Sequence, residues 1–396
     1  MRIQNLESLS MFDTAQRSNN PLFWSDLKEL MAHLANINTI GQSSLPDSLT
    51  NLTLSGPFDG TLDILPAGLK KLNLRSAASW NREIPPDTLP PGIESIQFGY
   101  SFNQSLDGLP SSVTNLALGG SYEKVIECPS LHSLSIESVK PRFSTSPYPL
   151  LTTLLFEGVT SQVLSKINGT VFPVLNRLTI NQLVDQPPAP MDLSTLPPSL
   201  RHLDVGLNNM PSALPVGLDT LRVNLEAATN CQPLRSGLLP DSITNLTLEG
   251  YAIPFQLGDI PQSVTSLYLR KHTLELDHNM LPSSLRTLWF TVRRFQKADQ
   301  HCPFIARELR KLPITITEVS ITMPSIAVTF KLYRLSDTVF LRLTNTLEKS
   351  GILDISRPDL EEFIDRATSG HSSFSNTING DLVKKHRTKT SKCITM

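Results

Sequence analysis

Apolar residues recur along this chain at one fixed spacing, and a Leu-Pro pair opens most of the copies. Residues 89–118 contain two copies in succession, and each has three apolar residues after its Leu-Pro pair. These residues are Ile93, Ile96 and Phe98 in the first copy, and Val113, Leu116 and Leu118 in the second. The last two of each triplet alternate with a single residue, Gln97 or Ala117, which predicts a short strand with one buried face.

The copies continue on both sides of this stretch and form an array. Thirteen prolines mark their starts, mostly 18–25 residues apart. They are Pro46, Pro66, Pro90, Pro110, Pro129, Pro149, Pro173, Pro197, Pro215, Pro240, Pro261, Pro282 and Pro313. A unit this short cannot bury its own apolar face, so the copies must stack on one another. The pattern predicts a leucine-rich-repeat-like solenoid over residues 45–324, with parallel strands on its concave face.

Three neighbouring copies depart from this pattern in the turn before the strand. In residues 128–136, 148–156 and 172–180, the first apolar residue follows the proline one position early. The residues of the strand itself keep their usual spacing in all three copies. We therefore predict a deletion in the turn of each copy, with the strand intact.

The LxxLxL text of the copies resembles a leucine-rich repeat, and residues 89–119 resemble the FNIP repeat, named for its Phe-Asn-Ile-Pro core. The Phe-Asn pair of that core occurs at Phe102 and Asn103. The leading LPxxLxxL also resembles the short leucine-rich repeats of bacterial effectors, with an asparagine in the expected place at Asn208. The resemblance extends less closely over the rest of 45–291. It implies a curved parallel-β solenoid used for binding, and it carries over no catalytic residues.

Residues 1–44 precede the array and contain apolar residues at helical spacing. These are Leu27, Leu30, Met31, Leu34 and Ile37. Ser25 stands before them as an N-cap and Gly41 follows them, which predicts a short helix. This helix would be an N-terminal cap, because the end of an array must be shielded from water. The other interpretation is a docking helix or a degenerate F-box.

Residues 325–368 are predicted to form an α/β cap at the other end of the array. Four apolar residues alternate at its start, namely Ile326, Val328, Phe330 and Leu332. A second extended run at 339–343 follows a short turn, so we expect a hairpin. A helix is predicted after Pro358, because its first turn is acidic. Two long intervals before the cap, 272–279 and 293–306, are predicted to be loop insertions.

Composition and charge argue against several classes of function. The chain has 35 Lys and Arg against 36 Asp and Glu, and this formal net charge of −1 does not favour a nucleic-acid partner. Its four cysteines lie far apart, so neither zinc nor a disulfide framework is expected. No phosphate loop or paired-carboxylate motif is present. The sequence therefore predicts a protein that is not an enzyme and uses no metal or cofactor.

Two cysteines and the N-terminus are the remaining candidates for a metal site, a catalytic thiol or a signal peptide. Cys128 with His132 supplies too few ligands for a metal site, and Cys302 has no His/Asp constellation around it. The N-terminus lacks the apolar segment of a signal peptide, and no apolar run approaches a bilayer span. A cytosolic location is expected.

The last four residues, Cys393-Ile394-Thr395-Met396, match a C-a-a-X box whose terminal Met favours a farnesyl group on Cys393. Prenylated proteins of this kind lose the last three residues, and the new carboxylate is methylated. Residues 369–396 have few aromatic residues and are rich in Ser, Thr, Asn and Lys, which predicts a disordered tail that can present the box.

Five basic residues precede the box, namely Lys384, Lys385, Arg387, Lys389 and Lys392. One lipid chain gives only reversible anchoring, and basic residues near an anionic leaflet supply a second signal. We therefore expect the chain on the cytoplasmic face of a membrane, with a cytosolic pool.

The strand residues that point to the concave face are the candidates for binding a protein partner. In LxxLxL this is the residue between the last two apolar positions, and its neighbours on the same face. The first half of the array has small neutral residues there, whereas the second half has charged and aromatic ones, which concentrate binding energy at interfaces. The predicted site is Arg177, His202, Asp204, Arg222, Tyr268, Arg270 and Trp289. The alternative is that the insertion at 293–306 or the C-terminal cap covers Tyr268 and Trp289.

Three functions fit this organisation. The first is a non-enzymatic, protein-binding scaffold tethered to a membrane. The second is a substrate-recognition adaptor for ubiquitin ligation, which needs residues 21–37 to bind a ligase subunit. The third is a ligase effector of the bacterial leucine-rich-repeat type, but residues 325–396 are too few for its catalytic domain. The first function is the prediction.

Overall fold

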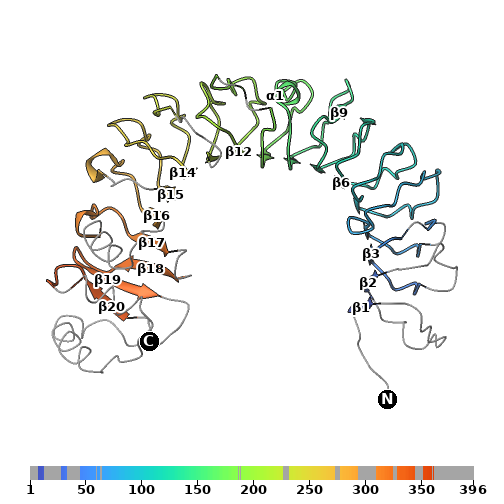
Figure 1. Ribbon diagram of the computed structural model, residues 1–396, viewed down its shortest axis with the longest axis horizontal. Coiled ribbons are helices and arrows are strands. Elements are labelled where there is room, and N and C mark those ends of the chain that lie inside the picture. Colours follow the sequence, from blue (N-terminus) through green and yellow to red (C-terminus); the bar gives the residue numbers. More distant parts are fainter. Residues whose placement is uncertain are drawn as a thin grey trace, which may run out of the picture. The chain divides into compact units, whose positions relative to one another are not determined.

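The computed structural model divides the chain into two compact units, residues 1–291 (unit 1) and 292–396 (unit 2). The structure describes residues 8–12, 28–33, 45–58, 60–62, 65–185, 187, 189–225, 232–272, 277–292, 309–323, 328–343, 351–358 and 360. Within unit 1, the strands lie on the inner side of the arc and the connectors between them on the outer side (Figure 1).

Each repeat proline is followed by one strand. The strands that follow the prolines from Pro46 to Pro282 are β3 (Asn51–Ser55), β4 (Lys71–Asn73), β5 (Ser95–Gln97), β6 (Asn115–Leu118), β8 (Ser133–Ile136), β10 (Thr153–Phe156), β11 (Arg177–Ile180), β12 (His202–Gly206), β13 (Thr220–Asn224), β14 (Asn245–Glu249), β15 (Ser266–His272) and β16 (Thr287–Val292). From β3 to β15 each strand pairs in parallel with the next along this series, with equivalent leucines opposite one another, as in Leu52↔Leu72. The predicted parallel-β solenoid is confirmed.

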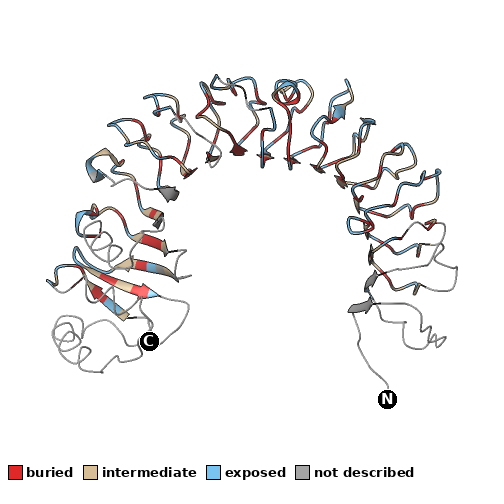
Figure 2. Ribbon diagram, viewed as in Figure 1, coloured by how far each residue is buried: buried red, intermediate tan, exposed pale blue. Residues whose placement is uncertain are grey.

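The core of unit 1 runs between the strands and the connectors. Buried residues alternate with partly exposed ones along each strand, and most exposed residues lie on the outer connectors (Figure 2). The connectors carry little regular structure: a short helix α1 (Ser161–Leu164), a 3-10 turn η2 (His278–Met280), and the paired strands β7 (Val125–Ile126) and β9 (Arg142–Phe143). The fold therefore rests on the strands and on contacts between successive rungs.

The turn before most of these strands is closed by one backbone hydrogen bond. In the regular copies other than that of Pro215, the first inward residue donates its N–H to the proline carbonyl three residues earlier, as Leu49 does to Pro46 at 3.1 Å. In the three irregular copies the donors Leu131, Leu151 and Leu175 bond to Cys128, Tyr148 and Phe172. These bonds also span three residues, so the predicted deletion is wrong. The proline has instead moved from the first to the second position of the turn, where its fixed φ is favoured.

An aromatic stack and an asparagine ladder join the connectors of neighbouring rungs. Phe102 lies between Trp80 (5.6 Å between ring centroids) and Tyr122 (6.1 Å). Asn81 Oδ1 accepts from the Asn103 N–H at 2.8 Å, and Asn103 Oδ1 accepts from the next rung. Trp80-Asn81 thus occupies the same place as the Phe-Asn pair one rung later. At the site of the bacterial-type asparagine, Asn209 rather than Asn208 makes such a bond, to the Gln232 N–H.

A serine just before the first inward residue also links successive rungs. Its hydroxyl donates to the carbonyl of the first inward residue of the preceding rung, as Ser284 does to Val264 at 2.8 Å. The same bond is made by Ser112, Ser130, Ser199 and Ser242. Ser263 stands at this position too, but its buried Oγ has no partner within the described part of the chain. Ser284 and Ser263 therefore occupy the same position in adjacent rungs, and only Ser284 makes the bond to a described residue.

We expect Ser284→Ala to lower the free energy of unfolding by about 1 kcal/mol, because it removes a hydrogen bond and leaves a buried carbonyl without this donor. Ser263→Ala should leave stability unchanged or raise it, since it removes a buried hydroxyl that bonds to no described residue. Urea unfolding midpoints of the two variants measure the difference. Equal shifts in both variants would show that the serine bond contributes nothing.

The N-terminal segment is a strand where a helix was expected. Strand β2 (Glu29–His33) pairs in parallel with β3, and strand β1 (Ser8–Phe12) pairs in parallel with β2. Leu30 is buried opposite Leu52. The first strand of an array leaves a row of N–H and C=O groups unpaired, and a strand satisfies them whereas a helix cannot. The prediction of a helical N-terminal cap is therefore wrong over these residues.

Unit 2 contains an antiparallel sheet of β17 (Glu318–Met323), β18 (Val328–Arg334), β19 (Val339–Leu343) and β20 (Gly351–Asp354). The predicted hairpin is confirmed as β18–β19, and the N–H groups of Leu335 and Ser336 donate to the Val339 carbonyl at its turn. Arg334 fixes the preceding segment by donating to the Ile316 carbonyl at 2.8 Å. Of the helix expected after Pro358, Leu360 is described, and it is helical and buried.

The basic tail and the C-a-a-X box, with Cys393 and the five basic residues before it, lie outside the described residues. So do 293–308 and residues 273–276 of the insertion at 272–279.

Candidate protein-binding surface

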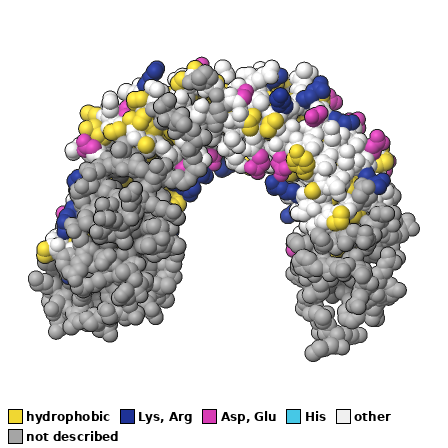
Figure 3. All heavy atoms as spheres, in the orientation of Figure 1, with side chains coloured by type: hydrophobic (Ala, Val, Ile, Leu, Met, Phe, Trp, Pro, Cys, Tyr) yellow, Lys and Arg dark blue, Asp and Glu magenta, His cyan; other side chains and the backbone are white. Residues whose placement is uncertain are grey.

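The second half of unit 1 places the predicted binding residues on adjacent strands. The register aligns Asp204 with Arg222, and Arg222 with Thr247 and then Tyr268. Two residues further along, Glu249 aligns with Arg270. Side chains at one register position of a parallel sheet point to the same face, so these residues share the concave face. Charged side chains of both signs lie along the inner edge of the arc in the view of Figure 3.

Four charged residues on β12 to β15 form a continuous chain of ion pairs. Arg222 lies between two carboxylates, 3.5 Å from Asp204 Oδ2 and 3.0 Å from Glu249 Oε2. Arg270 lies 3.7 Å from the same Glu249 oxygen. Glu249 is buried, with its side chain only 9% exposed, and its carboxylate sits between two guanidinium groups. The pairs therefore hold both arginines in defined positions.

The chain of contacts continues into two aromatic rings. The Arg270 guanidinium lies 5.1 Å from the centroid of the Trp289 ring, in cation–π contact. Tyr268 packs edge-on against Trp289, with 5.4 Å between ring centroids and an interplanar angle of 78°. We call the whole set the concave ladder: Asp204, Arg222, Glu249, Arg270, Trp289 and Tyr268. It is preorganised, since its charged members are each held by a neighbour.

Arg177 and His202 of the predicted site lie beside this ladder. They are aligned in the register of β11 and β12. Burial, and then the positive charge of Arg177, lowers the pKa of His202, so the imidazole is uncharged at neutral pH. The Arg177 side chain makes no hydrogen bond or ion pair with any described residue; its backbone N–H donates to the Thr152 carbonyl. It is thus a cation on this face that a partner can pair with.

The pKa of the Asp204 carboxyl is raised, whereas that of His202 is lowered. Burial is the main cause and raises the pKa of Asp204; Arg222 counteracts this, while the charge of Glu249 adds to it. Glu249 and Asp204 both lie beside Arg222, so its single positive charge is shared between two carboxylates. The ladder as a whole therefore depends on both arginines.

Glu249 joins the two arginines, but the sequence reading did not select it. The prediction used the residue between the last two apolar positions and added Arg177, His202 and Arg270 from the flanking positions of the same face. Glu249 occupies the same flanking position as Arg270, its partner in the register. Taking the residue two places beyond the middle position on every strand would have found it.

The same position carries a second ion-pair group in the first half of the array. Arg75 pairs with Glu137 at 2.6 Å, although the rungs of β5 and β6 lie between the two residues. Gly99 and Gly119 occupy this position in the rungs between, so no side chain stands in the way. A Cβ at Gly119 would lie 2.2 Å from the Gly99 carbonyl oxygen, which requires glycine there. Sequence reasoning missed this group too.

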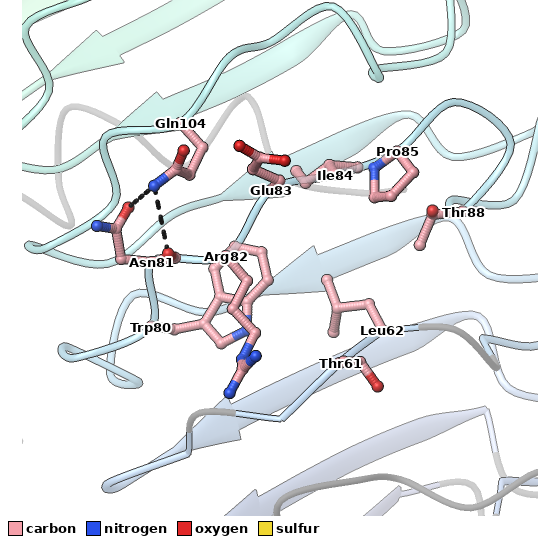
Figure 4. Close-up of a pocket in the computed structure, with 10 residues that line it drawn as sticks. All are labelled: Thr61, Leu62, Trp80, Asn81, Arg82, Glu83, Ile84, Pro85, Thr88 and Gln104. Carbon is pink, nitrogen blue, oxygen red and sulfur yellow. Dashed lines mark hydrogen bonds between the residues drawn. The ribbon is translucent and has the colours of Figure 1, made fainter.

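A cavity of about 410 Å³ opens among the connectors of the first rungs (Figure 4). Leu62, Trp80 and Ile84 contribute apolar surface to it. Several of its polar groups are engaged within the chain: Trp80 Nε1 donates to the Gly60 carbonyl at 2.8 Å, and Gln104 donates to the Asn81 amide oxygen at 3.1 Å. These bonds hold neighbouring rungs together, and we assign no ligand to the cavity.

Among the described residues, no group of three or more His, Cys, Asp or Glu could hold a metal ion. Burial raises the pKa of the Cys128 thiol to about 11, and Asp107 and Glu127 add to the shift. This thiol is therefore protonated at neutral pH and a poor nucleophile. In the part of the chain that the structure covers, no helix has the length and apolar character needed to cross a bilayer.

Comparison with family models agrees with the repeat organisation. The family model described as FNIP Repeat matches residues 80–121 and 251–291, which contain β5, β6, β15 and β16. A crystal structure of CroV588, described as a novel circular LRR protein, is 22% identical with a TM-score of 0.46. The match covers 75% of this chain and 53% of that one, so it spans about half of the CroV588 chain. A search of curated proteins finds no match. The FNIP matches confirm that this is a repeat protein.

Proposed function

We propose that this chain is a non-enzymatic scaffold that binds a protein partner through the concave ladder. The observation that carries the proposal is the unbroken series of contacts from Asp204 to Tyr268, which crosses five adjacent strands. Tyr, Trp and Arg are the residues that contribute most to binding energy at protein interfaces. Here they are held in place before binding, so ordering them costs little when a partner arrives.

The size of the surface favours a protein over a small molecule. The ladder is spread over β12 to β16, and strands lie about 4.8 Å apart, so it extends about 19 Å across the sheet. Small ligands bind in enclosed pockets that cover most of their surface. A row of half-buried side chains along an open sheet matches the flat contact of a folded partner or an extended segment.

The test is capture of partners by the tagged full-length chain with both ladder aromatics truncated. We expect Tyr268→Ala with Trp289→Ala to weaken capture by at least about tenfold, because two central aromatic contacts are lost. The fold should be intact, since both side chains are half-buried at the surface of the sheet. Quantitative mass spectrometry of captured proteins is the readout.

Tyr100→Ala is the matched control, since Tyr100 is 61% exposed on the connector after β5. Proteins that are lost with the double variant and kept with Tyr100→Ala are the partners of the ladder. Equal capture by all three chains would move the binding site away from the concave face.

We also propose that the scaffold is attached to the cytoplasmic face of a membrane by a farnesylated Cys393. The support is the C-a-a-X sequence at residues 393–396 together with five basic residues between 384 and 392. Each basic residue near an anionic leaflet adds about 1 kcal/mol to membrane binding. Lipid and charge together then give retention that neither supplies alone.

The adaptor function for ubiquitin ligation has no specific observation in its favour. It requires a docking helix within residues 21–37, and the described part of that segment is strand β2, which is paired with β3. Deleting 1–40 tests it directly. The adaptor proposal predicts loss of ligase subunits from the captured proteins, whereas the scaffold proposal predicts no change in them.

A further inference from the structure

An exposed apolar stripe follows the turns in the middle of unit 1. The second position of the turn is proline or valine in five consecutive rungs, before β8, β10, β11, β12 and β13. In the rungs on either side it is polar, at Ser111 and Asp241. With the apolar residues that follow in two of the turns, the stripe consists of Pro129, Pro149, Leu150, Pro173, Val174, Pro198 and Val216. We call it the apolar rim.

The apolar rim is a continuous surface that faces water. Leu150, Val174 and Val216 are 45%, 40% and 83% exposed, and the four prolines are exposed as well. Hydroxyl bonds tie neighbouring turns together, as Ser199 does to Leu175 at 2.8 Å. The strands behind the turns pair in register, so the turns repeat about every 4.8 Å and the rim is about 19 Å long. Contiguous exposed apolar surface of this kind marks an interaction site.

Two arginines run beside the rim, at the start of the strands that follow these turns. Arg177 is exposed, and its guanidinium group makes no ion pair or hydrogen bond with the described residues. Arg201 donates through Nη1 to the carbonyls of Pro198, Leu200 and Gly217, and its Nε and Nη2 bond to no described residue. His202 lies between them and is uncharged at neutral pH. Asp219 bounds the group on the β13 side.

We propose that the apolar rim and these two arginines bind an extended acidic segment of a partner protein, with apolar side chains on alternate residues. This inference rests on the proposed function and names the chemistry of a partner of the same unit. In an extended segment, successive side chains point to opposite sides, and those on the same side lie about 7 Å apart. One set then packs on the rim while the carboxylates reach Arg177 and Arg201. Charge complementarity selects an acidic partner over a neutral or basic one.

The test uses a fluorescein-labelled pool of eight-residue peptides in which Asp or Glu alternates with Leu, Val or Ile. Two control pools replace the acidic residues by Lys or the apolar residues by Ser. Fluorescence anisotropy with the full chain should show binding of the acidic–apolar pool, with both control pools at least about tenfold weaker. Equal binding of the Lys pool would overturn the proposal.

Variants of the exposed residues then locate the site. Leu150→Ser with Val174→Ser and Val216→Ser should weaken peptide binding by about tenfold or more, since three apolar contacts are lost. Arg177→Gln should weaken it several-fold and reduce its dependence on salt. The matched controls are Leu257→Ser, at a leucine that is 76% exposed off the rim, and Arg142→Gln, on β9. Unchanged binding by the rim variants would contradict the proposal.

Two other occupants are distinguished by separate measurements. Rim-dependent sedimentation with anionic lipid vesicles, without peptide binding, would make the surface a membrane contact. A dimer in sedimentation velocity that the rim variant abolishes would make it a contact between two copies. Either result overturns the proposal. If the rim variants keep peptide binding while Tyr268→Ala with Trp289→Ala loses captured partners, the rim inference fails and the proposed function stands.

Discussion

Leu116→Asp is expected to unfold the rungs around β6. Leu116 is buried and lies between Ile96 and Leu134 in the register of three adjacent strands. Losing a buried leucine costs about 2–5 kcal/mol, and a buried carboxylate without a partner adds several more. The total is comparable with the whole stability of a typical domain, about 5–15 kcal/mol. Because the strand of each rung pairs with those of the adjacent rungs, the damage should spread from β6 to the rungs beside it.

The matched control is Asn115→Asp, which adds the same charge one residue away on the exposed side of the strand. Its effect should stay within about 0.5 kcal/mol. Circular dichroism, thermal melting and limited proteolysis compare the two variants with the natural chain. If Leu116→Asp melts like the natural chain, the assignment of the inward residues is wrong.

Cys393→Ser is expected to move the protein from the membrane fraction to the soluble fraction. The substitution removes the thiol that would carry the lipid, and the basic residues that remain are a weak anchor on their own. Cys128→Ser is the matched control, because Cys128 lies in the array and should not affect membrane binding. Fractionation of eukaryotic cells that express each variant is the measurement.

Charge and lipid contribute separately to this expectation. Neutralising the five basic residues should weaken membrane retention at low salt and have less effect at high salt, since salt screens that attraction. Mass spectrometry of the C-terminal peptide tests the modification itself. An unmodified Cys393-Ile-Thr-Met396 end in eukaryotic cells would contradict it.

The repeat core could be predicted because its period is written directly in the sequence. Leu52, Leu72 and Ile96 follow their prolines at the same distance, and stacking then requires parallel strands in register. The hairpin of unit 2 could be predicted for a similar reason, since strict alternation and a short turn favour no other local structure. In both places local pattern and long-range packing agree.

The N-terminal strands could not be predicted from local pattern. The apolar residues around Leu30 fit a helix by spacing, but β3 offers an unpaired strand edge that only another strand satisfies. That requirement arises from the neighbouring rung and is not visible in residues 25–37. The turn of the irregular copies was misread similarly, because the hydrogen-bond acceptor is Cys128 and not the proline after it.

The residues of the proposed binding surface were selected from the sequence, but the contacts between them were not predicted. Five of the seven residues meet in the concave ladder, and Arg177 and His202 lie beside it. The contacts depend on register, which places Glu249 beside Arg270 and between two guanidinium groups. Distances between rungs decide which charges pair, and Arg75 reaches Glu137 only because two glycines separate them. Such pairs require the structure.

Hydroxyl-radical footprinting of the full chain, free and with captured partner bound, tests the concave binding site most directly. Tryptophan and tyrosine side chains react readily, and the concave ladder contains one of each. We expect oxidation of Trp289 and Tyr268 to fall when the partner is bound, while oxidation of Tyr100, on the connector after β5, stays the same. Unchanged oxidation of Trp289 and Tyr268 together with protection of Tyr100 would contradict binding on the concave face.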